Sequence, residues 1–152
     1  MVLRKLKSSL RLEIQPLPNS TWGLSLAHKL PHEEWDFIRR ECYKIANYRC
    51  EICHSSESGI NAHELWVFDD KKLLQIFNGL ECCCTLCHDT HHFGRSSLVY
   101  NLPQIEELIR HWCRINKLTF RDFQKHRDEI FALSMKRASK HYTVMIGKRV
   151  LL

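Results

Sequence analysis

The fold is decided by the stretch that begins Cys50-Glu-Ile-Cys53, continues through Ala62-His63-Glu64 and ends Cys84-Thr-Leu-Cys87-His88-Asp-Thr-His91-His92. Its two Cys-x-x-Cys pairs enclose residues 54 to 83, an interval longer than that of a minimal zinc ribbon. The enclosed segment must therefore fold into elements of its own.

The two cysteine pairs have the spacing of zinc ligands. Each Cys-x-x-Cys turn places two sulfur atoms on one side, and two such turns supply a closed tetrahedral Zn²⁺ site. We predict that this structural zinc is held by Cys50, Cys53, Cys84 and Cys87. Cys82 and Cys83 are alternatives for the third ligand, but only Cys84 has a second cysteine at the same spacing.

A zinc ion held by four sulfur atoms needs no histidine, yet three histidines accompany the pairs. His63 lies within the enclosed segment, and His88 and His92 follow the second pair four residues apart. A helix that starts at Cys87 would place both of these imidazoles on one face. From there, they could hold a second, catalytic ion that keeps open coordination positions.

The segment from Tyr48 to Gly94 resembles the HNH endonucleases, whose ββα-metal core often carries such cysteine pairs. More closely, the chain resembles a bacterial and phage group with an A-H-E-x-W block, here residues 62–66, and a G-L-E-x-x-C-x-x-C-H block, here residues 79–88. In that group the resemblance extends to both flanks. It implies an α+β fold with a zinc-stabilised ββα-metal core, N-terminal and C-terminal helices, and a small terminal strand pair.

The resemblance also implies roles for individual residues. His63 takes the position of the general base, and His88 that of the final histidine of the HNH name. His92 matches a second metal-ligating histidine of the bacterial toxin nucleases in this superfamily. These roles imply a nuclease that hydrolyses DNA phosphodiester bonds with Mg²⁺, Mn²⁺ or another divalent ion.

Two positions depart from the family pattern. The residue before the base is usually a ligating Asp or His and is Ala62 here, and the middle Asn falls on Gly79, one place from Asn78. Another register makes His63 a ligand and Glu64 the base. The departures leave two alternatives: an inactive HNH-like zinc module that binds nucleic acid or a protein partner as a regulator or inhibitor, or a purely structural zinc protein.

Composition indicates the class of protein, the kind of partner and the cellular compartment that these functions imply. Apolar residues make up 44% of the chain and only five residues are Gly, which is typical of a folded protein. The net charge of +6 favours a polyanionic partner such as nucleic acid. No segment has the apolar length of a membrane helix or of a signal peptide core. The eight cysteines, six of them in the paired region, therefore suit a reducing cytoplasm better than a secreted disulfide scaffold.

We predict a single domain over residues 1–152. Its N-terminal strand and helix flank spans 10–47, the metal core spans 48–94, and the C-terminal helical flank with its strand spans 95–152. Hydrophobic periodicity predicts these elements: a strand at 10–14 paired with a final strand at 142–146, an extended segment at 22–26, a helix from Pro31, a strand at 60–67 bearing His63, a helix over 69–77 ended by Gly79, a loop at 93–97, and helices from Pro103 and over 120–140.

The predicted helices have distinct apolar and charged faces. The helix from Pro31 should pack with Trp35, Ile38, Cys42 and Ile45, so Cys42 is a core residue and not a ligand. The last helix should turn Phe123, Ile130, Phe131 and Met135 inward. Its other face forms a basic row that lies along a phosphate backbone or is simply solvated: Arg121, Lys125, Arg127, Lys136, Arg137 and Lys140. Arg95, in the predicted loop, either contacts the scissile phosphate or is exposed, and His111 and Cys113 fall outside the ligand set.

Overall fold

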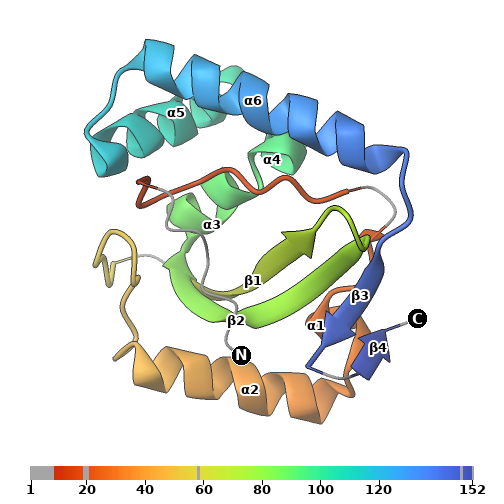
Figure 1. The fold of residues 1–152 in the computed structure, drawn as a ribbon. Helices are drawn as coiled ribbons and strands as arrows, with labels where there is room; N and C mark the ends of the chain where they lie inside the picture. The colour runs from red at the N-terminus through yellow and green to blue at the C-terminus, as the bar shows by residue number, and fades with distance from the viewer. Residues whose placement is uncertain (1–8, 19–20, 58, 148, 152) are drawn as a thin grey trace.

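The chain folds into a mixed α+β structure, seen in a computed structural model that describes residues 9–18, 21–57, 59–147 and, for the backbone alone, 149–151. Figure 1 shows the arrangement of its elements. The helices within these residues are α1 (Leu26–Lys29), α2 (His32–Ile45), α3 (Thr85–His91), α4 (Phe93–Val99), α5 (Leu102–Asn116) and α6 (Phe120–Ala138). The strands are β1 (Ile60–Asp69), β2 (Leu74–Cys84), β3 (Thr143–Ile146) and β4 (Arg149–Leu151).

A long antiparallel hairpin, β1 with β2, forms the centre of the fold. It runs from the pair Ile60 and Cys84 to the pair Asp69 and Leu74, with a bulge between Glu64 and Trp66. Strand β3 pairs in parallel with the start of β2, and β4 pairs with β3, so the sheet order is β1-β2-β3-β4. Strand β2 leads directly into α3 at Thr85.

The helix predicted over residues 69–77 is wrong, because this region is the hairpin turn and the start of β2. Asp69 accepts hydrogen bonds from the backbone N–H of Lys71 and Lys72 at 3.1 and 2.9 Å, much as a helix cap would. A local signal of this kind fits a turn as well as a helix. Pairing with β1 makes residues 74–77 a strand and not a helix. Gly79, with φ of +115°, lies at the bulge of the hairpin and does not end a helix.

The helices enclose the hairpin from two sides. Helix α2 contacts β1 and β2 on one side, while α3 contacts both strands on the other and α5 packs on α3 (Figure 1). Capping boxes at Asn101 with Gln104 and at Thr119 with Asp122 begin α5 and α6. The hairpin therefore separates an α2 face from an α3 face.

The strand predicted at residues 10–14, and its pairing with the final strand, are also wrong. This segment runs between the hairpin and the pair α5 and α6 (Figure 1). Asn116 Oδ1 accepts hydrogen bonds from Arg11 N and Leu12 N at 2.9 and 3.1 Å, and His126 Nε2 accepts one from Ile14 N at 3.1 Å. Side chains of α5 and α6 thus replace the partner strand, although Leu12 and Ile14 are buried as their alternation predicts.

Three further expectations differ from the structure. The segment predicted as extended contains α1, and the predicted loop at 93–97 is part of α4. Ile45 and Met135, predicted to face inward, are 78% and 77% exposed. Each lies towards the end of its helix, where none of the described elements covers the apolar stripe.

Arg137 does not belong to the predicted basic row. Only 7% exposed, it pairs with both carboxylate oxygens of Asp70 at 2.8 and 3.0 Å and lies 4.0 Å from the centroid of the Phe68 ring. The hydroxyl of Tyr142 donates to the same carboxylate at 2.7 Å. Asp70 therefore joins α6 to the hairpin turn through these contacts.

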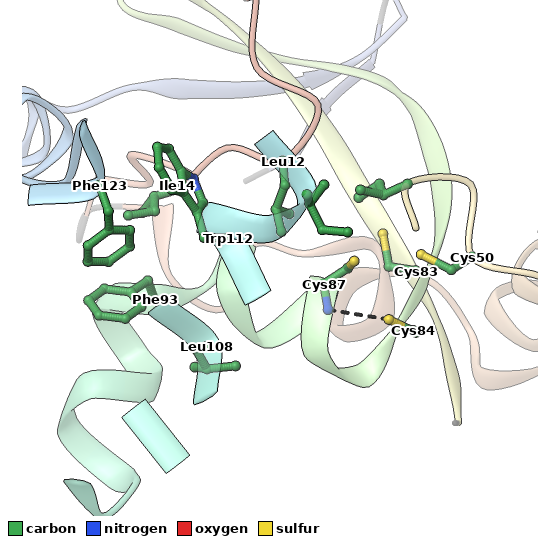
Figure 2. Close-up of a cluster of buried hydrophobic side chains, with 12 residues drawn as sticks. Leu12, Ile14, Cys50, Cys83, Cys84, Cys87, Phe93, Leu108, Trp112 and Phe123 are labelled. Carbon is green, nitrogen blue, oxygen red and sulfur yellow. Dashed lines mark hydrogen bonds between the residues drawn. The ribbon is translucent and has the colours of Figure 1, made fainter. Parts of the chain in front are cut away.

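One continuous apolar cluster lies on the α3 side of the hairpin. Figure 2 shows the rings of Phe93, Trp112 and Phe123 at one end and cysteine sulfur atoms at the other. Its buried members are Leu12, Ile14, Cys50, Ile52, Cys83, Cys84, Cys87, Phe93, Leu108, Trp112, Ile115 and Phe123. The core of the molecule is thus continuous with its cysteine-rich region.

We predict that Asn116→Ala lowers the free energy of unfolding by about 2 kcal/mol, because it leaves the N–H groups of Arg11 and Leu12 without their acceptor. Chemical denaturation would measure the change. Arg110→Ala, on the exposed face of the same helix, is the control and should change the value by less than about 0.5 kcal/mol. Equal effects of the two substitutions would contradict the role of Asn116.

Candidate metal centre

The four cysteines predicted as zinc ligands come together at the junction of β2 and α3. Their sulfur atoms all lie within 4.8 Å of one another, and Cys53 Sγ is 3.5 Å from Cys84 Sγ. A tetrahedral Zn²⁺ with bonds of about 2.3 Å separates its sulfur ligands by about 3.8 Å. The cluster therefore could bind zinc, and the alternatives Cys82 and Cys83 are not part of it.

Backbone hydrogen bonds shape both cysteine turns. Cys53 N donates to Cys50 Sγ at 3.4 Å, and Cys87 N donates to Cys84 Sγ at 3.5 Å, where Cys84 is also the N-cap of α3 (Figure 2). Hydrogen bonds from the thiols of Cys84 and Cys87 lower the pKa of Cys50, and the same contacts raise the pKa of Cys84 and Cys87. The cluster thus favours a thiolate at Cys50, and binding of a metal ion would release the protons of the other thiols.

Two cysteines outside the cluster behave as packing residues. Cys42 is partly buried in α2, as predicted, and Cys82 lies on the same side of the hairpin. Burial raises the pKa of Cys42 to about 11 and that of Cys82 to about 12. Both therefore remain thiols at neutral pH.

His111 supports the cluster from α5, a role that the sequence did not reveal. Its Nε2 lies 3.1 Å from Cys87 Sγ, and Arg114 donates to its Nδ1 at 2.9 Å. A guanidinium only donates, so Nδ1 accepts and Nε2–H donates to the sulfur atom. Because α5 reaches Cys87 only through packing on α3, no local spacing could have predicted this contact.

The three predicted histidines also converge. His63 lies on β1 and is 1% exposed, His88 lies on α3, and His92 is the C-cap of that helix. Their ring nitrogens lie within 4.8 Å of one another, so all three could hold one ion. Helix α3 begins at Thr85 instead of Cys87, but the four-residue spacing still places His88 and His92 side by side, with ring centroids 4.7 Å apart.

The electrostatic setting keeps the imidazoles of His88 and His92 neutral. Burial lowers the pKa of His88, and burial with the neighbouring charges lowers the pKa of His92 to about 3. The positive charge of Arg95, an exposed residue of α4, contributes to both shifts. A neutral imidazole keeps the lone pair that binds a cation.

The remaining candidates lie outside this histidine cluster. The Glu64 carboxylate accepts a hydrogen bond from Leu26 N at 2.8 Å at the start of α1. Ala62, two residues earlier on β1, lies on the same face of the hairpin as Glu64. Asn78 lies beside Gly79 in the stretch of β2 opposite the bulge. The register that makes Glu64 the base thus has its carboxylate turned to α1, whereas His63 faces α3.

His91 is a further residue to which the sequence analysis assigned no role. Its ring stacks on that of His63, with centroids 4.1 Å apart and planes 5° apart, and its Nδ1 is 2.7 Å from the carbonyl oxygen of Glu13. The only sequence signal was its place in the His-His pair that ends α3. His91 therefore fixes the plane of the His63 ring.

Comparisons of the chain with protein-family models, with curated protein sequences and with solved structures find no match. Within the described part of the chain, no helix is both long enough and apolar enough to cross a membrane. The site therefore defines the chain by its chemistry, as an α+β protein with a four-cysteine cluster that could bind zinc and a three-histidine cluster beside it.

We predict that Cys87→Ser removes the ion bound by the four-cysteine cluster, because a hydroxyl is a poor replacement for a thiolate ligand. Zinc content per chain, measured by elemental mass spectrometry, should fall by one, and the thermal unfolding midpoint should fall with it. Cys113→Ser, which changes a cysteine outside the cluster, should retain the zinc of the wild type. Loss of zinc in both variants would contradict the assignment.

We predict that Glu64 makes stability depend on pH. Burial raises its pKa from 4.5 to about 7, so between these values the folded state holds a proton that the unfolded state releases. This contribution is complete below pH 4.5 and is lost as the pH rises to about 7. Glu64→Gln should therefore gain stability relative to the wild type as the pH rises through this interval, in denaturation series measured across it.

The exposed carboxylate of Glu106 provides the control for this measurement. Glu106→Gln should follow the wild type at every pH, because Glu106 forms only an exposed ion pair with Arg110. A constant difference between Glu64→Gln and the wild type across the interval would contradict the prediction.

Proposed function

We propose that the chain is an HNH-type nuclease that hydrolyses DNA phosphodiester bonds with a divalent metal ion. The observation that carries this proposal is the convergence of His63, from a hairpin strand, with His88 and His92, from the helix that follows the hairpin. The order of two antiparallel strands and a helix supports the proposal, because it resembles the order of a ββα-metal core. The four-cysteine cluster lies where the second strand becomes the helix.

The proposed chemistry needs a base, an electrophile and a fixed geometry. An ion held by His88 and His92 would supply Lewis-acid stabilisation of the charge that develops on the phosphate and the leaving 3′ oxygen. His63 accepts a proton from the attacking water through a ring nitrogen. The stacked ring of His91 holds His63 in one orientation, so the accepting nitrogen stays aligned.

The structural ion of this proposal is zinc in the four-cysteine cluster. It would tie the turn at Cys50 to the start of α3, and hence fix the helix that bears His88 and His92 relative to the strand that bears His63. Its function is positional, because four sulfur ligands leave no coordination site open to substrate.

Exposed basic side chains support a nucleic-acid partner. Arg95 is exposed on α4, and Arg121, Lys125 and Lys136 remain exposed on α6. With a net charge of +6, these groups suit a phosphate backbone, whose neutralisation makes binding salt-dependent. The setting we propose is the cytoplasm, where the thiols stay reduced.

A second candidate function is a binding module that retains this core without cleaving nucleic acid. Two observations favour it: Ala62 supplies no ligand where the family has one, and the His63 ring is only 1% exposed. Such a module would act by binding to a nucleic acid or to a protein partner. Salt-dependent DNA binding without nicking in Mg²⁺ or Mn²⁺ would identify it.

We predict that His63→Ala reduces plasmid nicking in Mg²⁺ or Mn²⁺ by about 10²-fold to 10⁴-fold, the contribution of a general base. His141→Ala, which changes an exposed histidine before β3, is the control and should nick at the wild-type rate. Full activity of His63→Ala would contradict the proposed base, and absence of nicking by the wild type in every divalent ion would contradict the nuclease.

The same variant separates two roles of His63. If His63 is a base, its removal leaves the affinity for the second ion unchanged. If His63 is a third ligand, its removal weakens that affinity together with activity. Isothermal titration of Mn²⁺ into His63→Ala and His92→Ala measures the difference. The proposal expects weakened binding in His92→Ala alone.

A further inference from the structure

A third group of metal-type donors lies next to the histidine cluster and is not used by the proposed chemistry. It consists of Glu81 and Cys83 on β2 and His91 on α3, whose donor atoms lie within 4.8 Å of one another. Residues two apart on a strand point to the same face, so Glu81 and Cys83 both face α3. Glu81 also pairs across the hairpin with His63.

The hydrogen bonding of His91 leaves one nitrogen pointed at this group. Its Nδ1 lies 2.7 Å from the carbonyl oxygen of Glu13, an acceptor, so Nδ1 carries the proton of the neutral ring. Nε2 then presents a lone pair to Glu81 Oε2 at 3.4 Å. His91 is only 3% exposed, and among the described residues this Nε2 has no hydrogen-bond partner.

These two acceptors face each other where His91 is buried and the Glu81 side chain is 23% exposed, an arrangement that favours a cation between them. A proton on Nε2 or a metal ion would supply that positive charge, and burial without either is unfavourable. Cys83 is the third donor of the group, because its buried thiol donates a hydrogen bond to the same Glu81 oxygen at 3.7 Å, and a metal ion could replace the proton of that bond. A thiol, an imidazole and a carboxylate together form a donor set suited to Zn²⁺.

We propose that Glu81, Cys83 and His91 bind a Zn²⁺-class ion at a site separate from the four-cysteine and three-histidine clusters. The Glu81 side chain is 23% exposed, which gives the ion a path from solvent and leaves a fourth position for water. Binding would release the proton of the Cys83 thiol to solvent.

The site would act on the neighbouring histidines through His91. The rings of His91 and His63 are nearly parallel, with centroids 4.1 Å apart. An ion bound to Nε2 would hold the His91 ring in place, and the His63 ring stacks on it. This ion has a positional effect and does not depend on the nuclease proposal, because the donor set stands whether or not the chain cleaves DNA.

Metal stoichiometry in paired cysteine variants tests the site. The full chain is loaded with Zn²⁺ under reducing conditions, freed of excess metal, and weighed by native mass spectrometry. Cys83→Ala should carry one zinc fewer than the wild type, while Cys82→Ala, an adjacent buried cysteine outside all three donor groups, should match the wild type. Equal zinc content in Cys83→Ala and the wild type overturns the proposal.

A second variant and a spectroscopic measurement guard against misfolding of Cys83→Ala. Glu81→Gln preserves the shape of a partly exposed side chain and should weaken the affinity for one zinc ion by about tenfold or more. In ¹⁵N NMR of the zinc-loaded wild type, His91 Nε2 should carry no proton. Wild-type zinc affinity in Glu81→Gln, or a His91 ring with protons on both nitrogens, overturns the proposal.

Discussion

The convergence of four sulfur atoms at one junction is the constraint on which the rest of the structure depends. Cys50 and Cys53 lie within the loop between α2 and β1, whereas Cys84 and Cys87 lie where β2 becomes α3. Because Cys84 is the last residue of the strand and the N-cap of the helix, the cluster fixes the position at which α3 leaves the sheet. That position brings the end of α3 over β1 and places His88 and His92 against His63.

The two faces of the hairpin carry different chemistry, because side chains alternate along a strand. The face towards α3 holds His63, Glu81 and Cys83, which meet the histidines of that helix. The face towards α2 holds Cys82, while Glu64 reaches the first turn of α1. Burial keeps His88 and His92 neutral, and it keeps the thiols of Cys42 and Cys82 protonated.

The predictions that the structure contradicts share a physical cause. The pattern over residues 69–77 has a capping acid and apolar spacing that suit either a helix or a turn and strand, and only pairing with β1 distinguishes them. The alternation at residues 10–14 correctly predicted which side chains are buried. It could not reveal that Asn116 and His126, more than a hundred residues away, supply the hydrogen bonds that a strand would otherwise provide. Arg137 lies in a basic row by sequence, yet Asp70 draws it into the interior.

The sequence by itself determined the four cysteines that could bind zinc and the three histidines beside them, because ligand spacing within a turn or along a helix is a local property. It also determined the α+β class and the starts of α5 and α6, which depend on local caps. Only the tertiary structure decided that His111 supports Cys87, that His91 stacks on His63 and joins Glu81 and Cys83, and that Glu64 turns to α1. These contacts join segments that meet only after the helices pack on the hairpin, and no spacing along the chain specifies them.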